Sequence, residues 1–416
     1  MSAAPTANTT LEEGAVPVEG TTAVGILGET EQHGMKAHSD GGDAYVPVQS
    51  RAERFTSTDV ADFEKVTGYE LEWKLTPIKR ITALLEGELD GSVPATVLPE
   101  GVVGVSASWV DRTDARIGSA GAPEERASAN AWSAFEKALS IDITGEELHE
   151  FHIQRSQLDQ TPRAAHTVIT AAPFSRGLVI LSNSGDAQLS ENVEIVVGDQ
   201  AELTVVTVQE WTDESNHLAS HFARVGRDAR LRHIVVSLGG GVVRVNPSIH
   251  LVETGADASA FGAYFADSGQ HLEQRVYIDH VAAQTKSRVK YKGALQGATA
   301  RSVWVGDVLI GPHATGTDSY EENRNLVLSE GPRADSIPNL EIETGDIHGA
   351  GHASSTGRFD DEQLFYLQSR GIPEPEARRL VVRGFLAEIV AQIGSDAVET
   401  KLSAAIEAEL TRAQES

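Results

Sequence analysis

The chain has 416 residues and a mass of 44.4 kDa, which is enough to bury a core without disulfide or metal staples. Its 61 acidic residues outnumber its 34 basic ones, and the net charge of −27 argues against nucleic acid or an anionic membrane as a partner. It has no cysteine, which excludes disulfide frameworks, thiolate nucleophiles, cysteine-based zinc sites and self-contained iron–sulfur ligation. A secretory leader pattern and a membrane-length apolar run are both missing, so we expect a cytoplasmic protein.

The first part of the chain divides into two segments. Residues 1–50 carry seven acidic residues, one lysine and one aromatic residue, so they cannot bury enough apolar surface to offset their ordering entropy. We predict an acidic, disordered tail there. Residues 51–150 mix short helical patterns, the longest over residues 123–141, with strand-like pieces, which predicts an N-terminal mixed α/β domain.

Residues 151–353 read as short β-branched strands with period-2 alternation. A Gly-x-x-Ala turn followed by a strand recurs at Gly198, Gly226, Gly255, Gly297, Gly311 and Gly331. The first four intervals are 28, 29, 42 and 14 residues, near multiples of about 14, and the last, 20, breaks the series. A short period of turn and strand, with glycine at the turn, favours a β-solenoid, and a β-sandwich of irregular strands is the alternative.

Residues 354–416 turn helical. The acidic residues at 360–362 favour a helix N-terminus, and Gly371 with Pro373 ends that helix. Pro375 suits the first turn of a second helix, and a third is predicted from Asp396 to about Ala413. We expect this helical domain to cover the open edge of the last solenoid coil.

Motifs for nucleotide chemistry are weak. No phosphate-binding Gly-x-x-x-x-Gly-Lys-Ser/Thr loop occurs, so we expect no ATP hydrolysis by this chain. The glycines at 349 and 351 imitate the start of a dinucleotide fingerprint but lack a βαβ unit. His348 and His352 are four residues apart, and the glycines between them argue against a helix, so a loop would present either imidazole. A solvated surface histidine is the plain alternative.

Carboxylates in the strand region allow a second class of function. Solenoid enzymes that cleave acidic sugars use clustered aspartates, and candidates here are Asp267, Asp279, Asp307 and Asp318. The strong negative charge and the missing export signal fit poorly with such a substrate. A β-helix polysaccharide lyase or hydrolase is therefore kept as the alternative function.

Two parts of the sequence resemble a known family. Residues 323–342 and 351–372 closely resemble the SufB/SufD family of iron–sulfur cluster assembly proteins. Residues 59–63 and 72–77 are similar to the N-terminal region of its SufD-type members. The likeness runs from about residue 51 to the end and is weaker in the middle.

The resemblance implies a mainly β fold, in which a right-handed parallel β-helix (151–353) lies between an N-terminal mixed domain (51–150) and a C-terminal helical domain (354–416). It also implies a non-catalytic subunit that pairs with a cysteine-containing SufB-type paralogue through the β-helix. The helical domain would dock a SufC-type ABC ATPase, with partner-binding candidates at Arg358, Asp360, Asp361, Glu362, Tyr366 and Arg370. Because a cluster-building scaffold supplies thiolates, the absence of cysteine places this chain in the SufD-type branch.

The resemblance also singles out His352. It matches a histidine that lies at the SufB interface in the family and is a candidate cluster ligand, and His348 is a second candidate. Some members carry a cysteine just before it, where this chain has Ala350 and Gly351. We expect no cofactor bound by the chain alone and a transient cluster shared with SufB. A flavin has been associated with such complexes, but no residue here identifies a pocket for it. Pairing of two copies of this chain is a further possibility that the sequence leaves open. ATPase closure would pull on the C-terminal helices and re-order the loop that carries His352.

Overall fold

A computed structural model of the chain describes residues 54–358 and 361–415, with the side chains of 361–363 and 412–415 left out. The predicted disordered tail, residues 1–50, lies outside the described residues. The helices are η1 (Val60–Asp62), α1 (Ile78–Glu86), α2 (Arg126–Ala134), α3 (Asp361–Ser369), α4 (Glu374–Val390) and α5 (Asp396–Glu415). The strands are β1 (Val105–Asp111), β2 (Lys137–Ile143), β3 (Leu148–Arg155), β4 (Pro162–Ala171), β5 (Arg176–Gly185), β6 (Gln188–Val197), β7 (Glu202–Trp211), β8 (Asn216–Val225), β9 (Arg230–Ser237), β10 (Val242–Leu251), β11 (Asp257–Ala266), β12 (His271–His280), β13 (Lys286–Leu295), β14 (Arg301–Ile310), β15 (Thr317–Val327), β16 (Arg333–Ile342) and β17 (Ile347–Arg358).

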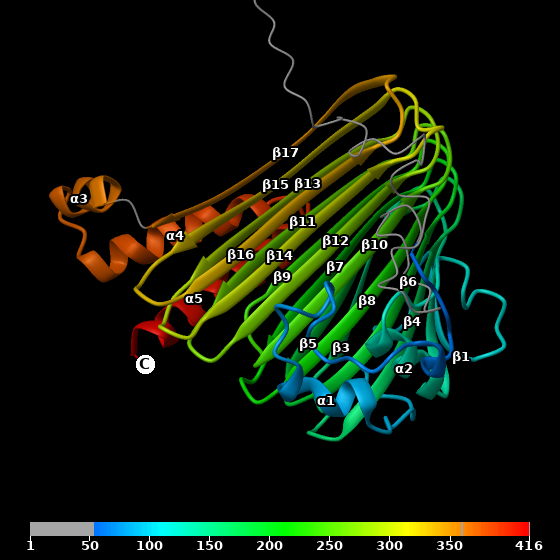
Figure 1. The fold of residues 1–416 in the computed structure, drawn as a ribbon, viewed down its shortest axis with the longest axis horizontal. Helices are drawn as coiled ribbons and strands as arrows, with labels where there is room; N and C mark the ends of the chain where they lie inside the picture. Colours follow the sequence, from blue (N-terminus) through cyan, green and yellow to red (C-terminus); the bar gives the residue numbers. More distant parts are fainter. Residues whose placement is uncertain (1–53, 359–360, 416) are drawn as a thin grey trace, which may run out of the picture. The chain divides into compact units, whose positions relative to one another are not determined.

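The strands form a parallel β-solenoid of about eight coils (Figure 1). Even-numbered strands from β2 to β16 build sheet A, and odd-numbered strands from β3 to β17 build the eight-stranded sheet B. Strand β1 adds to the end of sheet A in the antiparallel direction. Each coil therefore places one strand in each sheet, which confirms the solenoid prediction and excludes the sandwich.

The glycine turns at Gly198, Gly226 and Gly255 recur once in each coil, after β6, β8 and β10. Most strands have ten residues, and a turn of a few residues leads into the opposite sheet. Val197 at the end of β6 pairs with Val225 at the end of β8, so one full coil takes 28 residues here, twice the period of about 14. At the turn that follows, Gly226 donates its N–H to the carbonyl of Val197 at 2.9 Å. Gly255 at another such turn has a φ of 79°, a conformation that glycine adopts without strain.

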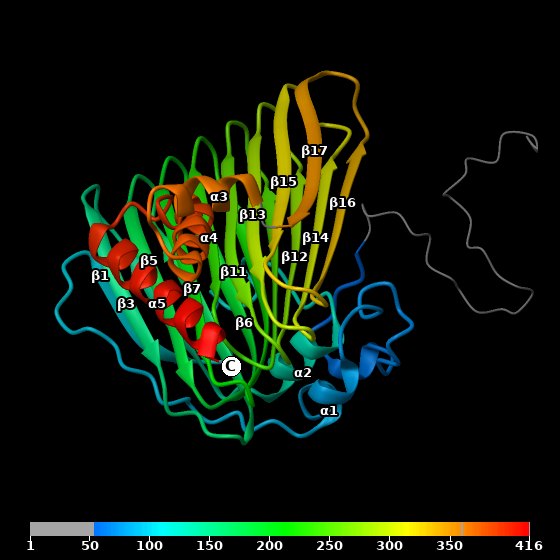
Figure 2. The same ribbon diagram turned by 90° about the vertical axis from the view of Figure 1, so that its left-hand side faces the viewer.

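The solenoid interior is the main core, and both outer faces are covered. Helices α1 and α2 and the segment that carries Trp73 pack on the outer face of sheet A, where Trp132 contacts Phe222 of β8. Helices α4 and α5 share a second apolar cluster with the outward side chains of sheet B, from β5 to β13 (Figure 2). The prediction that the helices cover the edge of the last coil is wrong, because their apolar faces match the outward Val, Ile and Leu of the earlier coils instead.

Buried ion pairs fix the N-terminal segment to sheet A. The guanidinium of Arg244 bonds to Glu125 and to Glu273, at 3.1 Å from the latter, and lies over the Trp73 ring at 3.8 Å. Thr76 also donates its hydroxyl to Glu273 at 2.8 Å. The expected helical stretch over 123–141 is only partly right. Helix α2 ends at Ala134, and the alternation that follows pairs as β2.

The solenoid interior also holds neutral histidines, which predicts a pH-dependent stability. The His280 ring contacts Thr285 Oγ1 at 2.8 Å and Ser287 Oγ at 2.9 Å, and burial lowers its pKa from 6.5 to about 4. The unfolded chain therefore binds more protons than the folded chain between these values, so this stability is full above pH 6.5 and is lost as pH falls toward 4.

We expect His280→Gln to reduce the pH dependence of the unfolding free energy by about 1.4 kcal/mol per pH unit in that window. Urea unfolding at pH 7, 6 and 5 measures it, and an unchanged slope in the variant would contradict this assignment.

In the part of the chain that the structure describes, no helix is both long enough and apolar enough to cross a membrane.

Candidate functional site

His352 lies within strand β17, the last strand of sheet B, and not in a loop as the sequence predicted. Glycine is a weak strand former, but pairing with β15 along its length holds Gly349 and Gly351 extended. The side chain of His352 faces the same side as the inward residues of β15. Its place is therefore set by sheet pairing.

A buried carboxylate lies beside His352. Glu321 of β15 is its direct partner in the parallel register. His352 Nδ1 is 3.6 Å from Glu321 Oε1, and the side chains are 45% and 1% exposed respectively. The histidine thus stands at the boundary between the solenoid interior and the surface.

His348 occupies a different environment. The β15–β17 register skips one residue between Ile347 and Gly349, so His348 is the extra residue of a β-bulge. His348 lies near Asp318. A hydrogen bond from Arg288 is the main cause that lowers the pKa of the Asp318 carboxyl, and the charge interaction with His348 is a smaller one. The structure therefore does not bring the two histidines together in one site. Among the described residues, no group of three His, Asp or Glu side chains could hold a metal ion.

The two ends of the solenoid differ. At the first coil, β1 and the partly buried Leu98 and Val102 pack against the core. At the last coil, β16 and β17 are the terminal strands of their sheets, and inward residues such as Leu340 and Ala350 are only partly buried. Exposed apolar side chains also gather near this end, at Tyr320, Ile337 and Ile342. This end is suited to pair with another sheet.

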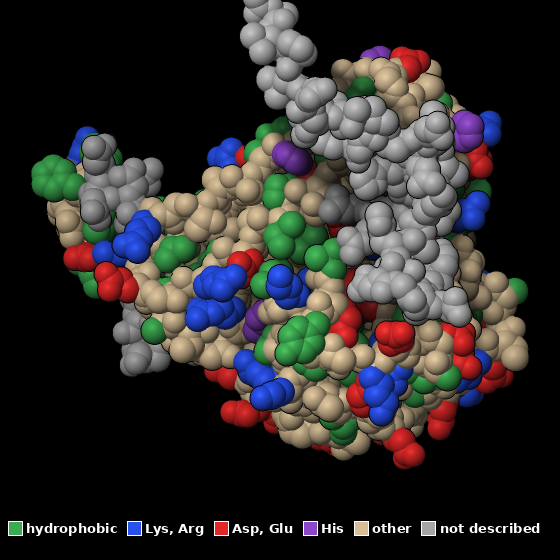
Figure 3. Space-filling view, in the orientation of Figure 1, with side chains coloured by type: hydrophobic (Ala, Val, Ile, Leu, Met, Phe, Trp, Pro, Cys, Tyr) green, Lys and Arg blue, Asp and Glu red, His purple; other side chains and the backbone are tan. Residues whose placement is uncertain are grey.

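Helix α3 presents aromatic side chains outward. Phe365 is 73% exposed and Tyr366 is 56% exposed, while Leu364 beside them is buried. The guanidinium of Arg370 lies 5.1 Å from the centre of the Tyr366 ring. Figure 3 shows apolar side chains at the tip of the molecule that α3 forms. Phe365 was missed by the sequence analysis, although its place next to a buried leucine in a helix signals an outward aromatic residue.

The other predicted partner-binding residues are placed as follows. Arg358 is the last residue of β17 and is exposed. Asp360 lies outside the described residues, and the side chains of Asp361 and Glu362, in the first turn of α3, are not described either.

Helix α4 is fastened to sheet B by charge as well as by apolar contact. Glu388 accepts hydrogen bonds from Lys290, at 2.7 Å, and from Lys292. Hydrogen bonding from Lys290 first, and then from Lys292, lowers the pKa of Glu388 to about 2. The Lys292 ammonium lies 4.6 Å from the centre of the Phe385 ring. These contacts join the helices to the strand that neighbours β15.

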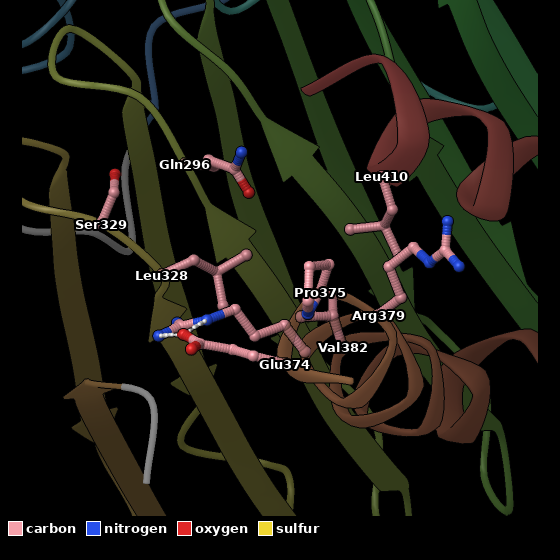
Figure 4. A pocket seen from close by; sticks show the side chains of 9 residues that line it. Gln296, Leu328, Ser329, Glu374, Pro375, Arg379, Val382 and Leu410 are labelled. Atoms are coloured by element: carbon pink, nitrogen blue, oxygen red, sulfur yellow. Dashed lines mark hydrogen bonds and ion pairs between the residues drawn. The ribbon is translucent and has the colours of Figure 1, made fainter. Parts of the chain in front are cut away.

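A pocket of about 600 Å³ lies between α4, α5 and the ends of β13 and β15 (Figure 4). Leu328, Val382 and Leu410 give it apolar walls, and Glu374 binds Arg378 at its edge at 2.8 Å. The pocket does not include either histidine of β17.

The aspartates considered for sugar cleavage do not converge. Asp318 lies on sheet B, whereas Asp279 and Asp307 lie on sheet A, and Asp267 follows β11 in a turn. Asp279 contacts His250 at 3.0 Å, and Asp307 accepts a hydrogen bond from Asn339 at 2.8 Å. Nothing in this arrangement favours polysaccharide chemistry.

One group on sheet A resembles a hydrolase triad. Ser248 Oγ is 3.2 Å from His250 Nε2, and His250 Nδ1 is 3.0 Å from Asp279. The Ser248 hydroxyl, however, is buried and donates its proton to Glu124 at 2.7 Å. Its oxygen is therefore not activated by the histidine, and the group fastens the N-terminal segment to the sheet.

Comparison with known proteins gives a consistent result. Residues 152–385 match the family described as "SUF system FeS cluster assembly, SufBD core domain". The iron-sulfur cluster assembly SufBD family protein Rv1462 of Mycobacterium tuberculosis (strain H37Rv) is 47% identical over 372 residues, covering 87% of this chain and 94% of that protein. ML0594 of Mycobacterium leprae, with the same description, is 46% identical over 371 residues, covering 87% and 95%. A second protein of that organism, ML0593, is 30% identical over 208 residues, covering 50% of this chain and 24% of that protein.

Proposed function

Because the chain belongs to the SufBD family of iron–sulfur cluster assembly proteins, we propose that it is the SufD-type, non-catalytic subunit of a cytoplasmic SufBCD-type complex. The observation that carries this proposal is His352, held on the last coil beside an open sheet edge in a chain without cysteine. Such a chain offers an imidazole to a cluster but no thiolate.

The open last coil supports a SufB-type partner. Strands β16 and β17 end their sheets, so a second solenoid can continue the pairing and cover Tyr320, Ile337 and Ile342. The partner would supply the soft sulfur ligands that iron prefers, and the nascent cluster would be cargo shared between the two chains. Mycobacterium leprae has two SufBD family proteins, which are 46% and 30% identical to this chain over the matched residues. Two different family members in one organism support a complex of two different subunits.

Helix α3 supports an ATPase partner. Its exposed Phe365 and Tyr366 offer an apolar contact, and it begins three residues after β17 ends at Arg358. Movement of α3 would therefore pull directly on the strand that carries His352, six residues before Arg358. The moving part in this mechanism is the end of a strand at an open edge. The Glu388 contacts hold α4 in place on sheet B while α3 moves.

Anaerobic affinity purification of the tagged chain from its native host tests this function. We expect an ABC-type ATPase and a cysteine-containing SufBD paralogue to co-purify and to be identified by mass spectrometry. The double variant Phe365→Ser, Tyr366→Ser should lose the ATPase and retain the paralogue, because only α3 is altered.

A matched control replaces two exposed side chains far from α3, Tyr69→Ser and Leu71→Ser, and should retain both partners. Recovery of the wild-type chain alone, or only with further copies of itself, would contradict the proposal.

A further inference from the structure

Glu321 is a buried acid at the one place where the solenoid interior meets His352. It is 1% exposed, and its carboxylate lies beneath the imidazole of the neighbouring strand. Inward positions of β15 are otherwise neutral, namely Thr317, Ser319, Asn323 and Asn325. Glu321 is therefore the one acidic side chain among the inward positions of β15, and it lies beside His352.

The opposite sheet is shaped around this carboxylate. Gly306 of β14 faces it across the interior, and a Cβ atom built there would lie 2.2 Å from Glu321 Oε2 and 2.5 Å from Trp304 Cη2. No residue larger than glycine fits without displacing both the carboxylate and the buried Trp304 ring. The fold therefore holds the Glu321 side chain in one place.

The contact distinguishes the two nitrogens of His352. Nδ1 is the nitrogen that faces Glu321 Oε1, at 3.6 Å, which leaves Nε2 for a ligand. A carboxylate at that position favours the tautomer with its proton on Nδ1 and a bare lone pair on Nε2. Histidines that bind metals commonly donate their other N–H to a carboxylate, which fixes the ring. Glu321 Oε1 lies on the Nδ1 side of His352 at 3.6 Å, slightly beyond hydrogen-bond length.

We propose that Glu321 is a positioning residue for His352: it holds the imidazole in the Nδ1–H tautomer with Nε2 directed to a cluster at the last coil. This inference rests on the proposed function for the identity of the ligand. The positioning itself is a property of this chain alone, and it is tested without partner or cluster.

The first test is the tautomer of His352 in the full chain labelled with ¹⁵N in its histidine rings. Long-range ¹H–¹⁵N spectra distinguish Nδ1–H from Nε2–H, and His352→Gln identifies the signal. We expect mainly Nδ1–H in the wild type and mainly Nε2–H in Glu321→Ala. Glu321→Gln should restore Nδ1–H, because its carbonyl oxygen still accepts a hydrogen bond.

The matched control is Glu322→Ala. Glu322 is the next residue on β15, is also buried, and faces outward toward Lys290 and Arg324. It should leave the His352 tautomer unchanged. Gly306→Ala is a second variant that keeps both Glu321 and His352 but displaces the carboxylate, and it should give the tautomer change of Glu321→Ala. The same tautomer in the wild type, Glu321→Ala and Gly306→Ala would overturn the proposal.

The second test is cluster assembly in the reconstituted complex. Glu321→Ala should lower the assembly rate about 10- to 100-fold, the usual effect of removing a carboxylate behind a metal-binding histidine, and Glu321→Gln should restore part of it. A normal rate in Glu321→Ala, when His352→Ala is inactive, would overturn the positioning role. Two results together would separate the two proposals. If His352→Ala assembles clusters normally, the proposed function fails. If the His352 tautomer in the chain that keeps this histidine still depends on Glu321, the geometric inference stands.

Discussion

His352→Ala is expected to cut cluster assembly by at least about tenfold while leaving the complex intact, because it removes the imidazole that we propose as the cluster ligand of this cysteine-free chain. The side chain is half exposed and packs little, so its truncation should cost the solenoid little stability. The measurement is anaerobic reconstitution with iron and a sulfide donor, followed by visible absorption of the cluster. Gel filtration of the same samples checks that the partners stay bound.

His348→Ala is the control for this experiment. It removes an exposed imidazole from the same strand, but from a bulge that lies apart from Glu321. We expect near-normal assembly. Equal activity of both variants and the wild type would remove β17 from the mechanism, and equal loss in both would show that the strand as a whole is needed and not His352 in particular.

Glu191→Ala should cost about 3–5 kcal/mol of folding free energy, because it leaves Arg155 as an uncompensated charge in the solenoid interior. Glu191 accepts hydrogen bonds from Arg155 and from His217 Nε2, the latter at 2.9 Å. Trp211 donates its indole N–H to His217 Nδ1 at 3.2 Å, so the proton on His217 must be on Nε2. Arg155 also donates to Thr167 at 2.8 Å. These hydrogen bonds join the five side chains in one buried network.

The pH dependence of this group has a definite sign. The Glu191 carboxyl is buried, which alone would raise its pKa, but the Arg155 charge and the His217 hydrogen bond outweigh burial and hold the pKa well below 4.5. A lowered carboxyl pKa gives stability that is present above the unfolded value and is lost as pH falls below it. Glu191→Ala should therefore lose less stability than the wild type on going from pH 5 to pH 3.

Urea unfolding measures both effects. The matched control is Glu202→Ala, which breaks exposed ion pairs with Arg176 and Arg230 on the surface of sheet B and should cost about 0–1 kcal/mol. The double variant Glu191→Ala, Arg155→Met should recover much of the lost folding free energy, because it also removes the buried guanidinium that Glu191→Ala leaves without its carboxylate. A cost for Glu191→Ala as small as that of Glu202→Ala would show that water reaches Arg155.

Some features follow from local sequence. The solenoid was predictable because its coils repeat a local pattern of short strands with alternating apolar residues, with glycine turns such as Gly198 and Gly226 one coil apart, and that pattern does not depend on distant contacts. The helix ends near Gly371 and at Asp396 were also local, since glycine and capping residues act within one turn. His352 was found by its place in a family motif, and no periodicity in the sequence would have indicated it.

Tertiary structure alone decided the rest. His352 is in a strand because β15 pairs with it, and Glu321, 31 residues earlier, becomes its neighbour only through the parallel register. The helices lie on sheet B because apolar side chains from five separate strands, β5 to β13, combine into one face that no single strand displays. Within residues 54–358 and 361–415, the last coil is consequently left without a further paired strand, with His352 on it. The composition of this chain determined that it cannot supply cysteine thiolates to a cluster, and only the pairing of distant strands determined where His352 stands.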